Sequence, residues 1–121
     1  MSYLTYLQSE VREKREQLER LNNCEAELEN LQSEFIQKRS LTKDPELTST
    51  TWKGNLANKF LQVREDVTYA YKDISQVQLD TALNTIENKI QEIRGQIESL
   101  HRSIASEKAR IEREEREERA D

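Results

Sequence analysis

The stretch SLTKDPELTSTTWKGNLANKF, residues 40–60, holds the only Pro and the only Trp of the 121-residue chain and one of its two Gly residues. Pro45 cannot occupy a helix interior, and it biases Asp44 away from helical geometry. The hydroxyl residues at 49–51 are candidate N-caps for a helix that starts here. The stretch therefore separates two helical segments, and it is short enough for the second to fold back on the first as a hairpin.

The segment before this break carries one narrow apolar stripe. Its apolar residues follow at steps of three and four, with one Lys in the series and a slip of one residue near Cys24: Leu4, Leu7, Val11, Leu18, Leu21, Cys24, Leu28, Leu31 and Phe35. This spacing predicts an amphipathic helix over residues 2–40, about 55–60 Å long at 1.5 Å per residue. We expect Cys24 to lie on the stripe as a small hydrophobic residue.

The segment after the break carries two apolar stripes. The first consists of Trp52, Leu56, Phe60, Val63, Val67, Ala70, Ile74 and Val77. The phase then changes, and a regular seam of 3.5-residue period follows: Leu79, Leu83, Ile86, Ile90, Ile93, Ile97, Leu100, Ile104 and Ile111. This seam is typical of a coiled coil. Because residues 75–78 include no Gly or Pro, a continuous or gently bent helix is favoured over a break.

The two patterns predict an all-α, elongated antiparallel helical hairpin in one domain, residues 1–121. It would comprise a helix over about residues 2–40, a turn over about 41–49 and a helix over about 50–116. The second helix would be roughly 100 Å long, and the first too short to cover it. We therefore expect part of the seam to lie uncovered and to bind a helix of another chain. This partner-binding seam comprises Leu83, Ile86, Ile90, Ile93, Ile97, Leu100 and Ile104.

Composition argues against several classes of function. Charged residues make up 36% of the chain, the net charge is −5, and Lys and Arg alternate with Glu instead of forming a basic stripe, which argues against nucleic-acid binding. No run approaches the roughly 20 apolar residues of a membrane span, and the N-terminus does not resemble an ordinary signal peptide. We expect a soluble, cytoplasmic chain.

The inventory of reactive residues also argues against catalysis. There is one Cys and one His, Cys24 and His101, which lie on different predicted helices without a third member of a nucleophilic triad. Neither a Gly-rich phosphate loop nor a His/Cys metal-ligand spacing is present. We expect no enzymatic activity, no cofactor and no metal.

The Trp lies in the first turn after the break, two residues before Gly54, which costs about 1 kcal/mol relative to Ala inside a helix. We expect another segment to approach closely there. TWKGNLANKF resembles the signature of the WXG superfamily, small helical hairpins linked to type VII secretion, and Trp52, Gly54, Ala57 and Phe60 match it. From LERLNNCEAELENLQSEF through DPELTSTTWKGNLANKF to the Ile-rich helix, the chain resembles the YwqH-like family of Gram-positive bacteria, which accompanies LXG toxins.

The resemblance implies a partner of an LXG toxin that binds the toxin's N-terminal helical domain and helps to present it for type VII secretion. A second small helical protein could join the complex, and the chain could leave the cell with its partner. Tyr69 and Asp73 fit the Y-x-x-x-D/E spacing of an export motif, although a surface contact within the helix explains them equally well. Two alternatives remain, a self-assembling structural coiled coil, for example a homodimer, and a free-standing secreted WXG-type substrate.

Overall fold

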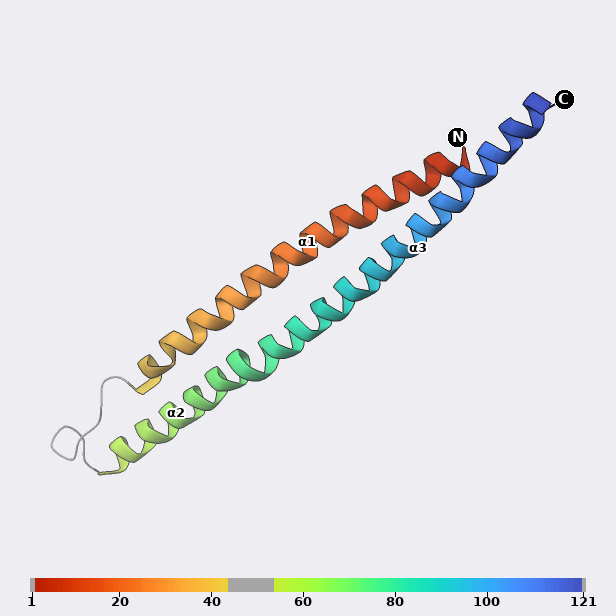
Figure 1. Cartoon of the computed structure of the whole chain (residues 1–121). Helices are drawn as coiled ribbons and strands as arrows, with labels where there is room; N and C mark the ends of the chain where they lie inside the picture. Colours follow the sequence, from red (N-terminus) through yellow and green to blue (C-terminus); the bar gives the residue numbers. More distant parts are fainter. Residues whose placement is uncertain (1, 44–53, 121) are drawn as a thin grey trace. The chain divides into compact units, whose positions relative to one another are not determined.

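The computed structural model describes residues 2–43 and 54–120, and within these ranges nearly every residue is helical (Figure 1). The elements are α1 (Tyr3–Gln37), the 3₁₀ helix η1 (Lys38–Lys43), α2 (Gly54–Lys72), the π-helix η2 (Asp73–Gln78) and α3 (Leu79–Ala120). The predicted all-α helical hairpin is confirmed. Most of the predicted turn and the predicted start of the second helix lie outside the described residues. In the described ranges, no helix has an apolar stretch long enough to cross a bilayer.

Local sequence explains where the described helices begin. At the start of α1, the hydroxyl of Ser2 accepts a hydrogen bond from the backbone N–H of Thr5 at 3.1 Å, which satisfies one of the free donors of the first turn. At the start of α2, Gly54 has a φ of +81°, a backbone conformation that residues with a Cβ rarely adopt. The Gly of the WXG-like motif is thus required by the backbone.

The chain divides into two compact units, which we describe separately. Unit 1 combines Met1–Cys24 with Ile86–Asp121, so that it pairs the first part of α1 with most of α3 (Figure 1). Its buried residues are aliphatic: Leu7, Val11, Ile90 and Ile93. Arg15 Nη2 lies 3.3 Å from His101 Nε2 and links the two antiparallel helices at the surface. Since Arg can only donate, the His101 nitrogen is the acceptor.

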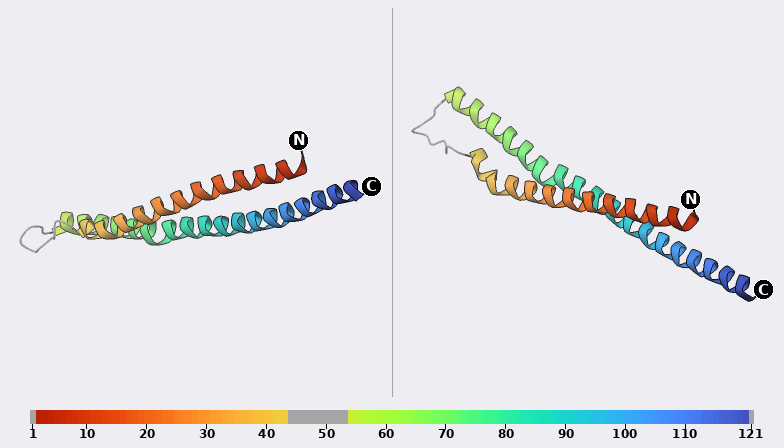
Figure 2. Two further views of the ribbon diagram at one scale, coloured as in Figure 1. Left: turned by 45° about the horizontal axis from the view of Figure 1, so that its top comes forward. Right: turned by 90° about the horizontal axis from the view of Figure 1, so that it is seen from above.

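Unit 2 spans Glu25–Thr85, and in it the end of α1 packs against the returning helix (Figure 2). The Phe35 and Tyr71 rings are 4.9 Å apart between centroids. Gln32 Nε2 donates to the backbone carbonyl of Ser75 at 2.9 Å and to Asp80 Oδ1 at 2.7 Å. Among the described residues of this unit, Ala57, Ser75 and Leu79 are buried.

The π-helix lies where the phase of the apolar pattern changes in the sequence. The backbone N–H of Leu79 donates to the carbonyl of Ile74, five residues earlier, where an α-helix would span four. One turn thus accommodates one extra residue, and the helix continues on both sides. The prediction of a continuous helix is confirmed from Gly54 to Ala120.

Two details of the predicted α1 stripe are wrong. Cys24 is exposed, and Leu31 is 40% exposed. The half-buried positions are instead Glu25 and Gln32, each one residue later. The slip near Cys24 therefore shifts the inward face by one residue, and Gln32 in place of Leu31 makes the polar contact with Ser75.

The prediction that part of the Ile-rich seam lies uncovered is wrong at the centre of the seam. Ile90 and Ile93 are each 1% exposed, and the other predicted seam residues are half-buried: Leu83, Ile86, Ile97, Leu100 and Ile104. Because unit 1 consists only of α1 and α3 segments, it is α1 that covers Ile90 and Ile93. Ile90 and Ile93 therefore need no partner helix to cover them, and binding of a partner by the seam stays a prediction.

Candidate partner-binding surface

A row of exposed apolar side chains lies on α2 and η2. We call it the outer stripe and define it by seven residues at alternating steps of four and three: Leu56, Phe60, Val63, Val67, Ala70, Ile74 and Val77. All are exposed, and the exposed fraction of the six larger side chains ranges from 37% for Phe60 and Ile74 to 67% for Leu56. The stripe has the 3.5-residue period of a coiled-coil seam over about three heptads, or roughly 32 Å of helix.

The face of α2 and η2 that points inward is instead mostly polar. Its members are buried or half-buried: Ala57, Arg64, Thr68, Tyr71 and Ser75. Most residues of the outer stripe directly precede one of these inward residues, as Val63 precedes Arg64 and Ile74 precedes Ser75. Since successive residues of an α-helix are about 100° apart, the outer stripe lies to one side of the α1-facing surface.

The π-turn determines which residues of α2 face α1. A purely α-helical chain running back from the buried seam of α3 would place residues such as Lys72 and Glu65 against α1. The extra residue of η2 rotates α2 by about one residue, or 100°, and brings Tyr71, Thr68 and Arg64 inward. Sequence periodicity indicated the phase change that signals this rotation, but it did not show which of the two stripes would lie uncovered.

Polar contacts hold η2 against α1. Ser75 is fully buried, its carbonyl accepts the bond from Gln32, and its hydroxyl donates to the Lys72 carbonyl at 3.3 Å. At the surface, Asp73 Oδ2 accepts a hydrogen bond from Gln78 Nε2 at 2.8 Å. These contacts satisfy backbone and side-chain groups at the π-turn and hold it against α1.

The WXG-like residues differ in their environments. Trp52 lies outside the described residues, Ala57 is 7% exposed, and Phe60 belongs to the outer stripe. The Arg64 guanidinium lies 5.0 Å from the centroid of the Phe60 ring, within the range of a cation–π contact. The segment that directly precedes Gly54 lies outside the described residues, so the expected close neighbour there stays a prediction. Beyond the adjoining backbone, no atom of a described residue lies within 4 Å of the point that a Cβ would occupy there.

No hydrogen bond joins Tyr69 and Asp73, the two residues of the predicted export motif. Tyr69 is 75% exposed, and Asp73 is half-buried at the start of η2 with Gln78 as its partner. Whether they act in export stays a prediction.

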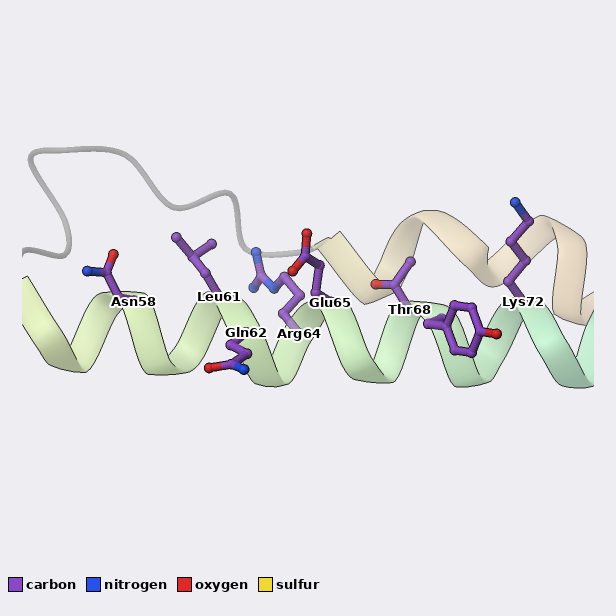
Figure 3. A pocket seen from close by; sticks show the side chains of 8 residues that line it. Asn58, Leu61, Gln62, Arg64, Glu65, Thr68 and Lys72 are labelled. Carbon is purple, nitrogen blue, oxygen red and sulfur yellow. The ribbon is translucent and has the colours of Figure 1, made fainter.

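A shallow groove lies along α2 on the side away from the outer stripe (Figure 3). Its volume is about 780 Å³, and its lining includes Leu61, Glu65, Thr68 and Lys72. The mixture of charged, polar and apolar side chains makes this groove less apolar than the outer stripe. Across the described ranges, no group of three or more His, Cys, Asp or Glu residues could hold a metal ion.

Comparison with known proteins identifies the family of the chain. Among curated proteins and among solved structures, none matches the chain. A family model does match, under the description YwqH-like, over residues 2–115. With nearly the whole helical hairpin covered by that model, the chain belongs to the YwqH-like family.

Proposed function

We propose that this chain is a non-enzymatic helical partner that binds the N-terminal helical domain of an LXG toxin and targets it for type VII secretion in a Gram-positive bacterium. Membership of the YwqH-like family supports the class of partner, through the association of that family with LXG toxins. The observation that carries the proposal is the outer stripe, a coiled-coil seam that no described part of the chain covers.

The physical reason is that such a stripe is costly to leave in water. Burying a Val, Leu, Ile or Phe side chain is favourable by roughly 1.5–3 kcal/mol, and the outer stripe offers six of them in one row. An amphipathic helix laid along this row is the recognition mode that fits the spacing. The partner would therefore bind at the outer stripe, and the Leu83–Ile104 seam would serve to hold α3 against α1.

Co-expression tests the proposal. The chain and the N-terminal helical domain of an LXG toxin from the same genome are produced together, and the mass of the purified species is measured by light scattering. We expect a stable heteromeric complex and improved solubility of the toxin domain. A chain that forms a homodimer and ignores the toxin domain supports the self-assembling coiled coil instead. Export of the chain without any toxin domain supports the free-standing substrate.

A further inference from the structure

A depression of about 340 Å³ lies on unit 1, where residues of α1 and α3 line it together. We call it the basic depression, because besides Gln8, Val11 and Ile104 its lining consists of four basic side chains: Arg12, Arg15, His101 and Lys108. Among the described residues, no Asp or Glu lines it. An acidic chain, of net charge −5, thus gathers basic groups from two helices at one place.

Two of these basic groups are in direct contact. Arg15 Nη2 donates to His101 Nε2 at 3.3 Å, so a guanidinium of α1 is held beside an imidazole of α3. This bond uses one of the five N–H donors of a guanidinium. It links the two walls of the basic depression without bringing a negative charge to it.

The sequence explains why the depression has no carboxylate of its own. On a helix, a Glu four residues before a Lys or Arg forms the favourable ion pair, as Glu112 does with Arg116 at 3.2 Å. We call Arg12, Arg15 and Lys108 the three cations. None of them has such a Glu, because the residues four positions earlier are Gln8, Val11 and Ile104.

The nearest carboxylates along the helices lie outside the lining. Those three or four residues away from a basic group of the depression are Glu16, Glu19, Glu98 and Glu112. Glu98 lines a neighbouring depression together with Arg94, and Glu112 bonds to Arg116. Glu16 and Glu19 are exposed, and each follows an Arg by four residues, which is the less favourable order. The ion pairs among the described residues involve other basic side chains than the three cations.

We propose that the basic depression binds the phosphate group of a small ligand. Two guanidinium groups and an ammonium group that surround one hollow can donate to several oxygens of a compact anion at once. A phosphate group offers three acceptor oxygens and nearly two negative charges, whereas a carboxylate offers two oxygens and one charge. The site goes beyond the proposed function, and it belongs to unit 1, whereas the outer stripe belongs to unit 2.

Titration of the full chain, followed by NMR, tests the site. The probes are inorganic diphosphate and acetate, each added at constant ionic strength. Diphosphate is expected to bind at least about tenfold more tightly than acetate and to shift the side-chain signals of Arg15 and His101. Equal binding of the two anions, or no saturable binding of diphosphate, overturns the proposal. A nucleoside diphosphate added in a third titration distinguishes a free phosphate from one carried on a larger molecule, because contacts beyond the phosphate would tighten its binding.

A pair of variants with the same change of charge locates the binding. R12Q/K108Q removes one cation from each helix of the basic depression and should weaken diphosphate binding at least about tenfold. The matched control, R20Q/R119Q, removes two exposed cations outside the lining and should leave the affinity within about twofold. Circular dichroism checks that both variants keep their helix content. Equal weakening in the two variants overturns the site, because it indicates unspecific attraction of the anion to the whole chain.

The mass of the chain in solution tests the rival occupant, a carboxylate-rich segment of a second copy. The mass measured by light scattering should be the same for the wild-type chain and for R12Q/K108Q. A homodimer that R12Q/K108Q dissociates shows that the basic depression holds a second copy, and it overturns the small phosphate ligand. Because none of these measurements involves the LXG domain, their outcome is independent of the proposed function.

Discussion

At the scale of single residues, Gln32 is the side chain whose role depends most on its exact position. Its amide donates to the carbonyl of the fully buried Ser75, at the π-turn that sets the facing of α2. In Gln32→Met this carbonyl loses its side-chain donor, and the free energy of unfolding should fall by about 1–3 kcal/mol. Urea denaturation measures the change, with Gln37→Met at an exposed position as the control. Equal effects of the two substitutions would show that the contact contributes nothing.

The second residue-scale prediction concerns pH at the end of α3. The side-chain hydrogen bond from Arg110 lowers the pKa of Glu107 below its ordinary value of 4.5. The stabilisation is therefore present above the pKa of the unfolded state and is lost as the pH falls through the lower folded-state pKa. In Arg110→Gln the pKa of Glu107 should rise, as measured by an NMR titration of its side-chain carboxyl. An unchanged titration curve would contradict the role of Arg110.

At the scale of elements, the two apolar rows of the second helical segment should respond differently to truncation. Ile90→Ala and Ile93→Ala each remove a side chain that is 1% exposed and should cost about 2–5 kcal/mol of unfolding free energy. Val67→Ala, at a residue that is 52% exposed, should change stability by only about 0.5 kcal/mol. Chemical denaturation followed by circular dichroism measures all three. A comparable loss in Val67→Ala would mean that the outer stripe is packed within the chain.

Sequence periodicity predicted the positions of the helices better than it predicted which side of each helix faces its neighbour. The steps of three and four around Leu7 and Val11, and the Ile-rich seam, identified the two helical segments and the buried core of unit 1. The break at Pro45 placed the division between them. The facing of α2 could not be predicted, because both stripes have the same period and either could pack against α1. The observed orientation of α2 is accompanied by polar contacts of Gln32 and Ser75. Such contacts leave no signal in hydrophobic periodicity.

At the scale of the whole molecule, the chain buries the centre of its stronger seam within its own fold and leaves the outer stripe exposed, where we propose that a partner binds. A partner that binds only the folded chain must also raise its apparent stability through linkage. With the LXG domain present at about 100 times its dissociation constant, the gain should be about 2.7 kcal/mol. Thermal unfolding of the mixture measures it. An unchanged unfolding temperature for the chain at that excess would contradict binding to the folded state.

The most direct measurement is the accessibility of single thiols to iodoacetamide in a Cys24→Ser background. In the free chain, Val67→Cys should react rapidly and Ile93→Cys slowly, because the outer stripe is uncovered and the seam is buried. Addition of the LXG domain should slow labelling of Val67→Cys at least about tenfold and leave Leu61→Cys unchanged. Slow labelling of Val67→Cys in the free chain would contradict an outer stripe that is exposed there. Rapid labelling of Val67→Cys within a complex of demonstrated mass would contradict a partner that covers the stripe.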